Sequence, residues 1–123
     1  MSMIKISESE WQVMNLVWER SPLSASEIVA TLGPKNGWHQ RTIRTLLDRL
    51  VKKKALKAKP EGKRFLYEPR ISREEGLRHE SQSFLQRVFG GEPVAMLLHL
   101  VEETKLSKED IEKLKNILSE KEK

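Results

Sequence analysis

The sequence predicts a mainly α-helical protein in which one small β-hairpin separates three N-terminal helices from three C-terminal helices. Four Ser-x-x-Glu/Asp patterns support the helices, since each stands just before an amphipathic stretch, and they begin at Ser7, Ser24, Ser72 and Ser107. This spacing is typical of capping boxes at helix N-termini. Residues 56–68 depart from the helical pattern, because alternation and aromatic residues there flank a Pro-Glu-Gly-Lys turn.

The first three helices are expected over about residues 8–19, 25–32 and 39–53. The second helix should end where Gly33 and Pro34 interrupt the pattern. The third helix has one apolar stripe at spacing i, i+3, i+4, i+7, i+8, made of Ile43, Leu46, Leu47, Leu50 and Val51. Such a stripe predicts a helix with one buried face.

The hairpin is expected to pair residues 56–59 with residues 64–68. Three further helices follow over about residues 73–89, 94–101 and 108–119, each with apolar residues at helical spacing. The order of elements is therefore a helical head with a hairpin, and then a second helical region.

We expect two domains, residues 1–70 and residues 71–123. The second is short for an independent core, and its helix 94–101 (VAMLLHLV) is apolar around most of its circumference. A second copy of the chain could cover it, and two-fold homodimers are the commonest assemblies. The residues expected at this dimerisation surface are Leu77, Phe84, Leu85, Val88, Leu97, Leu98, Val101, Ile111, Leu114 and Ile117.

Charge is concentrated in one part of the chain. The formal net charge is +5, but residues 35–64 hold 11 basic and 2 acidic residues, a local net charge of +9. Such a cluster indicates a polyanionic partner, although a solvated Lys-rich surface would have the same composition. Charge alone therefore marks residues 35–64 as a candidate polyanion-binding region and does not decide between these two interpretations.

Several function classes are excluded by what the sequence does not contain. It has no Cys, no apolar run long enough to span a membrane, and no secretory signal at its start. The three His are too far apart for a local metal motif, and no catalytic or nucleotide-binding motif is present. We therefore expect a cytoplasmic protein that is not an enzyme and has no metal or cofactor.

The third helix has the features of a DNA-recognition helix. Arg41 and Thr45 lie opposite the apolar stripe, and Thr42, Arg44 and Arg49 lie on its flanks. Arg can make two hydrogen bonds to guanine, and Thr offers a hydroxyl and a methyl group. The candidate DNA-binding residues are Arg41, Thr42, Arg44, Thr45, Arg49, Lys52 and Lys53 on or after this helix, and Lys57, Lys59, Lys63 and Arg64 on the hairpin.

A helix-turn-helix followed by a basic hairpin is the winged-helix arrangement, in which the hairpin would contact phosphates. The hairpin lysines could equally protect an exposed edge strand from pairing. Among the three tryptophans, Trp11 and Trp18 lie on the apolar stripe of the first helix and are expected in the core. Trp38 could either pack in the core or contact phosphate.

Residues 42–50 (TIRTLLDRL) followed by Lys52 and Lys53 resemble the signature of the penicillinase and methicillin-resistance repressor family, BlaI/MecI. Further segments fit the same family in the same order, namely residues 9–18 (SEWQVMNLVW), 24–28 (SASEI) and 106–114 (LSKEDIEKL). The similarity covers nearly the whole chain.

This resemblance implies a homodimeric repressor with an N-terminal winged helix and a C-terminal dimerisation region, bound to a palindromic operator. It also implies that Arg41, Thr42, Arg44 and Thr45 face operator bases and nearby phosphates. In the antibiotic-responsive branch of the family, a membrane sensor-protease system induces cleavage of an Asn-Phe bond. The corresponding bond here is His99–Leu100, so the cleavage-site residues are not kept.

Two other functions remain open at this point. The chain could be a ligand-responsive winged-helix regulator that is induced without proteolysis. It could also be a winged-helix module that binds protein. Such a module would show no salt-dependent affinity for duplex DNA and would capture its partner through the apolar C-terminal region.

Overall fold

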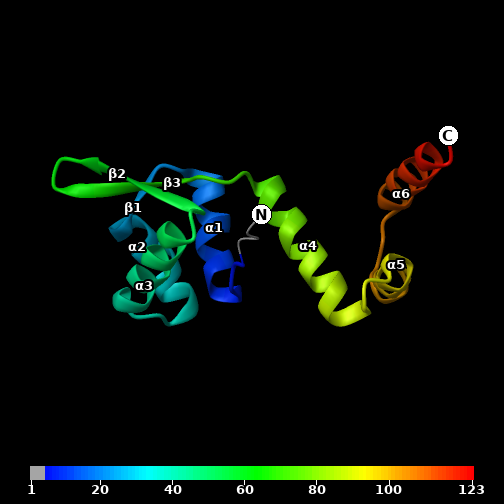
Figure 1. Cartoon of the computed structure of the whole chain (residues 1–123), viewed down its shortest axis with the longest axis horizontal. Helices are drawn as coiled ribbons and strands as arrows, with labels where there is room; N and C mark the ends of the chain where they lie inside the picture. Colours follow the sequence, from blue (N-terminus) through cyan, green and yellow to red (C-terminus); the bar gives the residue numbers. More distant parts are fainter. Residues whose placement is uncertain (1–4) are drawn as a thin grey trace. The chain divides into compact units, whose positions relative to one another are not determined.

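The computed structural model describes residues 5–123 and confirms the predicted fold class. Helices and a small antiparallel sheet follow one another in the expected order (Figure 1). Their bounds are α1 Glu8–Arg20, β1 Leu23–Ser24, α2 Ala25–Asn36, α3 Gln40–Lys52, β2 Leu56–Glu61, β3 Arg64–Pro69, α4 Arg73–Phe89, α5 Pro93–Glu103 and α6 Lys108–Lys121.

The chain forms two compact units that meet between Gln82 and Ser83, inside α4. The first unit contains α1 to β3 and the first part of α4, and the second contains the rest. The expected division lay near residue 70, at the end of the hairpin. It lies later in the structure because the first turns of α4 pack against α1, as described below.

Four predicted capping boxes are present at helix N-termini. The hydroxyl oxygens of Ser7, Ser24, Ser72 and Ser107 each accept a hydrogen bond from the backbone N–H three residues later, at 3.0–3.2 Å. In each case the acidic side chain at that third position accepts from the backbone N–H of the serine. These reciprocal bonds satisfy amide groups that have no partner within the helix.

The core of the first unit is formed where α1, α2 and α3 meet beside the sheet (Figure 1). Val13, Met14 and Val17 from α1 and Ile28 from α2 are fully buried. From α3 the buried side chains are Ile43, Leu46, Leu47 and Leu50, as the apolar stripe predicts. Burying each of these large side chains contributes about 1.5–3 kcal/mol to folding.

Helix α2 runs to Asn36, four residues beyond the expected end at Leu32, so that prediction was wrong. Pro34 lies in the last turns of the helix, where its missing N–H costs one hydrogen bond without breaking the helix. The helix ends instead at Gly37, whose φ of 69° is left-handed and whose N–H donates to the Gly33 carbonyl. This is the usual conformation of a glycine that ends a helix.

The sheet has three strands in the order β1-β3-β2, all antiparallel. Leu23 and Ser24 form the short β1, which pairs with Tyr67 and Leu66 and which the sequence did not predict. The hairpin itself is longer than expected, because β2 continues through Pro60 to Glu61 and only Gly62 and Lys63 form the turn. The hairpin therefore extends beyond the helices as a wing (Figure 1).

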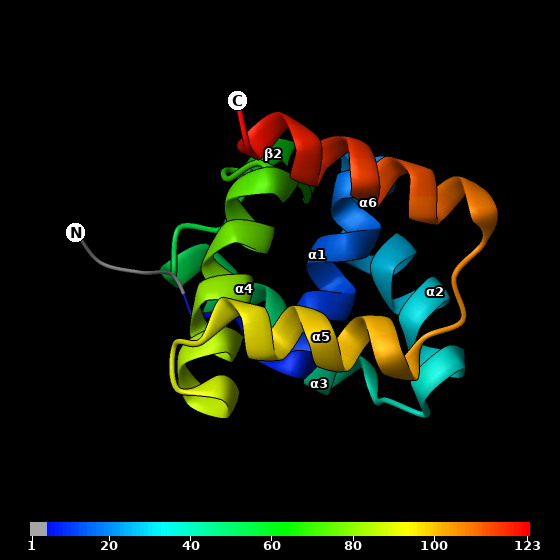
Figure 2. The same cartoon turned by 90° about the vertical axis from the view of Figure 1, so that its right-hand side faces the viewer.

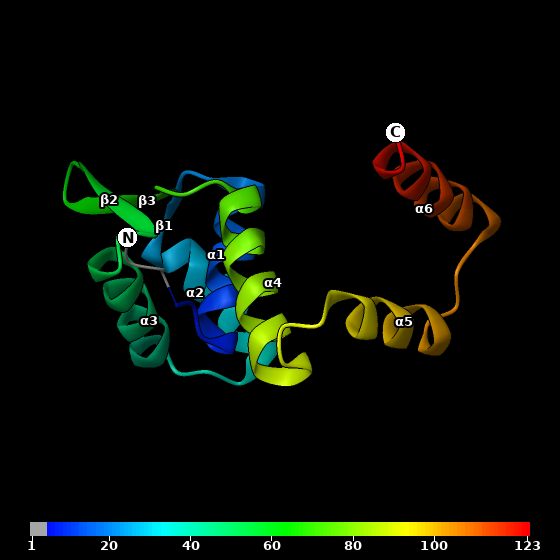
Figure 3. The same ribbon diagram turned by 45° about the vertical axis from the view of Figure 1, so that its right-hand side comes forward.

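The first part of α4 lies beside α1 (Figure 3). Two tryptophans of α1 contact it. The Trp18 indole N–H donates to the Ile71 carbonyl at 2.9 Å, and the Trp11 indole N–H donates to Glu80 at 3.4 Å. Gly76 is buried against both rings, which leave no room for a larger side chain. Trp11 and Trp18 were expected in the core, and both are half-buried and pack against it.

A Gly76→Ala variant tests this contact. A Cβ atom at Gly76 would lie 2.8 Å from Cη2 of Trp18, so the indole ring would have to move. We expect the free energy of unfolding to fall by about 1–3 kcal/mol, despite the gain of up to about 1 kcal/mol that Ala brings to a helix. Urea unfolding followed by tryptophan fluorescence measures the change. Ser81→Ala, on the exposed side of the same helix, is the control, and a stabilised Gly76→Ala would contradict the close contact.

The second unit has no buried residue among positions 83–123, all of which the structure describes. Its local contacts are aromatic, with Phe84 stacked on Phe89 at 6.0 Å between ring centroids and Phe89 tilted against His99 at 6.1 Å. Helices α5 and α6 follow as two successive helices joined by a short loop (Figure 2). Their apolar side chains are left without a core.

Candidate nucleic-acid interface

Helix α3 presents a row of exposed polar side chains on the side opposite its buried stripe. Arg41, Thr45 and Arg49 are all exposed, and the Thr45 hydroxyl donates to the Arg41 carbonyl at 2.9 Å. This bond directs the proton of Thr45 inward and leaves its oxygen and methyl group free for a ligand. The row has the length and the donor groups that reading a DNA groove requires.

The start of α3 is held by its N-cap and by the turn before it. The Nδ1 atom of His39 accepts a hydrogen bond from the Arg41 N–H at 3.0 Å. Sequence reasoning missed this role, because His is not a usual N-cap residue. Trp38, for which two roles were open, is half-buried and packs against the core. The first turn of α3 is therefore anchored directly beside Arg41.

Acidic neighbours hold several of the predicted wing cations. The Lys57 and Lys59 ammonium groups both lie 3.5 Å from the carboxylate of Glu68 on the neighbouring strand. Arg64 pairs with Glu61 across the turn at 3.1 Å. Exposed ion pairs of this kind contribute little stability, so these cations can exchange a carboxylate for a phosphate at small cost.

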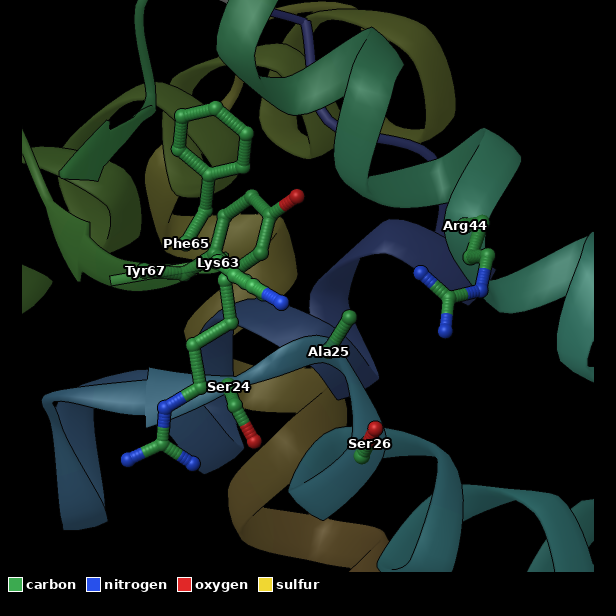
Figure 4. A pocket seen from close by; sticks show the side chains of 8 residues that line it. Ser24, Ala25, Ser26, Arg44, Lys63, Phe65 and Tyr67 are labelled. Carbon is green, nitrogen blue, oxygen red and sulfur yellow. The ribbon is translucent and has the colours of Figure 1, made fainter. Parts of the chain in front are cut away.

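A pocket of about 280 Å³ lies between α3, the N-terminus of α2 and the wing (Figure 4). Arg44 enters it from α3, and Lys63 and Arg64 enter it from the wing. The remaining lining residues are Ser24, Ala25, Ser26, Phe65 and Tyr67. The structure thus brings together three predicted site residues from two elements, and adds Ser26, Phe65 and Tyr67, which sequence reasoning did not select.

Tyr67 forms one wall of this pocket and remains uncharged. Burial raises the pKa of the Tyr67 hydroxyl above its ordinary value of 10.0, and the negative charge of Asp48 raises it further, against the opposing charge of Arg44. At neutral pH the hydroxyl is therefore protonated. It adds a hydrogen-bonding group to the pocket and no negative charge.

Lys53 is directed away from the predicted DNA-binding surface. Its ammonium group donates to the carboxylate of Glu10 and to the Lys5 carbonyl, which lies at 2.7 Å. Glu10 is only 1% exposed and is also part of the α1 capping box. The pair joins the start of α1 to the end of α3, so Lys53 has a structural partner that the sequence pattern did not reveal.

The environment of Glu10 fixes its charge. Burial alone would raise the pKa of its carboxyl group, but the hydrogen bond from Lys53, the bond from the Ser7 N–H and the charge of Lys53 outweigh it. The pKa of Glu10 is consequently held below its ordinary value of 4.5. A lowered pKa in the folded state means that the ionised carboxylate stabilises the fold at neutral pH.

Replacing Glu10 with Gln should therefore destabilise the protein in a pH-dependent way. At pH 7 we expect a loss of about 1–3 kcal/mol in the free energy of unfolding, because Lys53 loses its charged partner. The stabilisation by Glu10 is present above its unfolded-state pKa and is lost as pH falls through the lower folded-state pKa. The difference from the wild type should shrink below about pH 4.5. Urea unfolding from pH 7 to pH 3, with the exposed Glu8→Gln as control, measures this; a pH-independent difference would contradict it.

The predicted dimerisation residues remain largely exposed in the single chain. Leu77, Val88, Leu97, Leu98, Val101, Ile111, Leu114 and Ile117 are between 37% and 58% exposed. Phe84 and Leu85 are half-buried. Exposed apolar residues in this density are unusual on a monomeric surface.

The bond His99–Leu100, which the family resemblance predicts as a possible cleavage site, lies inside a helix. His99 and Leu100 are both exposed, and both stand in the middle of α5.

The residues that the structure describes contain no cluster of His, Cys, Asp or Glu that could hold a metal ion. None of the described helices is long and apolar enough to cross a membrane.

Comparison with known proteins identifies relatives over almost the whole chain. The family model described as penicillinase repressor matches residues 6–120. The penicillinase repressor of Bacillus licheniformis is 37% identical over 116 residues, which cover 94% of this chain and 91% of the relative. The methicillin resistance regulatory protein MecI of Staphylococcus aureus is 35% identical over 117 residues, with 95% of each chain covered.

Solved structures agree with these relatives. The DNA-binding domain of the repressor BlaI is similar with a TM-score of 0.56 and 35% identity, covering 60% of this chain and 90% of that domain. The Bacillus licheniformis BlaI monomer in complex with the blaP half-operator gives a TM-score of 0.54 at the same identity and coverage. The multidrug-efflux regulator MepR shares the fold alone, with a TM-score of 0.52 and 18% identity over 94% of this chain.

The winged-helix head and its charged outer surface are features of DNA-binding transcriptional regulators. The family match identifies the family of regulators to which the chain belongs. The chain belongs to the penicillinase repressor family, the BlaI/MecI family. Since this is a family of repressors, the protein is a regulator and not an enzyme.

Proposed function

We propose that this protein is a sequence-specific DNA-binding repressor that acts as a homodimer on a palindromic operator. The observation that carries the proposal is the exposed row on α3 beside a cationic wing, both held by one core. In winged-helix proteins the recognition helix enters the major groove while other elements hold phosphates. A BlaI domain of the same fold forms a complex with a half-operator, which supports the same use of this surface.

Base contacts and phosphate contacts would come from different parts of this surface. Arg41, Thr42 and Thr45 are exposed on the first turns of α3, where base edges are reached. Arg49, Lys52, Lys57 and Lys59 lie further along α3 and on β2, and would bind the backbone. Lys53 is left out of this set, because its ammonium group bonds to Glu10.

The homodimer is supported by the apolar surface of the second unit. Helix α5 exposes Val94, Leu97, Leu98 and Val101 at 47–62%, and burying this area in a second copy would stabilise both chains. A two-fold dimer presents two identical recognition helices, so the operator should consist of two inverted half-sites.

The names of the relatives support a proposal for the regulated genes. These relatives are a penicillinase repressor and a methicillin resistance regulatory protein, so we propose β-lactamase-type resistance genes as the targets of this repressor. Cleavage between His99 and Leu100 by a membrane sensor-protease system stays a prediction from the resemblance. A protease binds its substrate as extended chain, so α5 would have to unwind before such a cut.

Selection of duplexes from a random-sequence pool tests DNA recognition. We expect the selected duplex to be inverted-repeat DNA and to bind about 10³-fold or more tightly than random duplex in gel shifts. Both affinities should fall as salt rises, because bound cations release counterions from DNA. Equal affinity for selected and random DNA would contradict sequence-specific binding. Absence of salt-dependent affinity for any duplex would favour a protein-binding module.

A Leu97→Asp variant tests the dimer. A charge at this exposed apolar position should be poorly tolerated in a dimer interface and harmless in a monomer. Light scattering at micromolar concentration should give the mass of two chains for the wild type and of one chain for the variant. Glu102→Gln, on the same helix, is the control and should leave the dimer intact. A wild-type protein of one chain mass would contradict the proposal.

A further inference from the structure

Arg44 lies apart from the other exposed residues of α3. It is the residue of this helix that lines the pocket beside the wing, whereas Arg41, Thr42 and Thr45 do not line it. Its guanidinium group projects toward the space where Lys63 enters from the wing (Figure 4). Its position therefore groups Arg44 with the wing cations.

We propose that this pocket binds one backbone phosphate of duplex DNA and that Arg44 contacts this phosphate and no base. The inference rests on the proposed DNA-binding function and deepens it, since it assigns one α3 residue to a named kind of contact. Family resemblance alone left Arg44 facing both bases and nearby phosphates.

The charge of the pocket suits a phosphate. Arg44, Lys63 and Arg64 all line it, and no acidic side chain does. Among the residues that the structure describes, Arg44 and Lys63 form no ion pair. Arg64 pairs with the exposed Glu61 and also interacts with the charge of Glu27, which is exposed as well. A phosphodiester carries one negative charge and accepts two hydrogen bonds from a guanidinium group, so it fits the planar fork of Arg44.

The shape of the pocket suits the same ligand. Three elements enclose it, and the rings of Phe65 and Tyr67 limit it on the wing side (Figure 4). Ser24 is 3% exposed, and its hydroxyl accepts from the Glu27 N–H. That hydroxyl donates no hydrogen bond within the described chain, so its proton is available to an anion. The positive end of the α2 dipole adds to the attraction.

A phosphate held here would link the wing to the recognition helix. Arg44 comes from α3 and Lys63 from the turn of the hairpin, so one bound group would fix the distance between these two elements. Contacts of this kind set the register of a protein on DNA and carry no sequence information themselves. Base discrimination would then depend on Arg41, Thr42 and Thr45.

Three single variants of the full chain separate phosphate contact from base contact. Arg44→Ala and Lys63→Ala should weaken binding to the selected duplex and to random duplex by the same factor. Each should also reduce the magnitude of the salt slope by about 1. Arg41→Ala, one turn earlier on α3, is the matched control and should reduce affinity mainly for the selected duplex. Thermal unfolding should match the wild type for all three, since these side chains are exposed.

Neutral methylphosphonate linkages placed one at a time along the selected duplex locate the contact. We expect one linkage in each half-site to weaken binding of the wild type by a larger factor than binding of Arg44→Ala, because only the wild type has Arg44 to contact that phosphate. The same linkage should have its smallest effect on the double variant Arg44→Ala/Lys63→Ala. The double variant Arg44→Ala/Lys63→Ala should lose less than the product of the two single losses, because both residues would share one phosphate.

Inorganic phosphate, titrated at constant ionic strength, separates a backbone phosphate from a free anion. If free phosphate bound the wild type and not Arg44→Ala, while no methylphosphonate linkage weakened DNA binding of the wild type more than that of Arg44→Ala, the pocket would be a small-anion site and the proposal would be overturned. A loss of discrimination in Arg44→Ala, with random-duplex affinity intact, would also overturn it by placing Arg44 on a base. If the wild type itself did not discriminate, the proposed function would fail, which is a different outcome from either of these.

Discussion

Burial of the apolar stripe of α3 is the constraint on which the rest of this structure depends. Ile43, Leu47 and Leu50 are 0% exposed, and together their burial contributes several kcal/mol. Because the helical period is 3.6 residues, burying this stripe leaves no freedom in the direction of the opposite face. Arg41 and Thr45 point outward for that reason. The recognition surface is thus a consequence of core packing, and DNA would meet it already formed.

The basic side chains of the first unit fall into two groups, those paired with a buried carboxylate and those paired with a more exposed one. Lys53 bonds to Glu10, which is almost fully buried, and separating such a pair would leave a buried carboxylate without its opposite charge. Lys57 and Lys59 share the more exposed Glu68, and their pairs are weak because water screens them. A positive charge count over residues 35–64 therefore overstates what a polyanion can reach, since one of these cations is committed to the fold.

Prediction from sequence succeeded where the signal was local. The capping boxes at Ser7 and Ser72 and the stripe on α3 are each read within one or two helical turns, and the structure contains all of them. Prediction failed where distant residues decide. The two-residue β1 exists because Leu23 pairs with Tyr67, far along the chain. The end of α2 was misjudged because Pro34 is tolerated in a last turn that Gly37 closes.

The sequence by itself determined the order of the helices and the hairpin, the buried face of α3 and the family of the protein. The helices, the hairpin and the buried face depend on residues that are close together in the chain. The family is recognised from motifs that occur in the same order along the whole sequence. Only the tertiary structure decided where individual side chains go. In the folded chain the Lys53 ammonium group bonds to Glu10, Gly76 packs against Trp18, and Arg44 lines a pocket together with residues of the wing. The physical reason is that each of these contacts joins segments far apart in sequence, and their positions follow from the packing of the core.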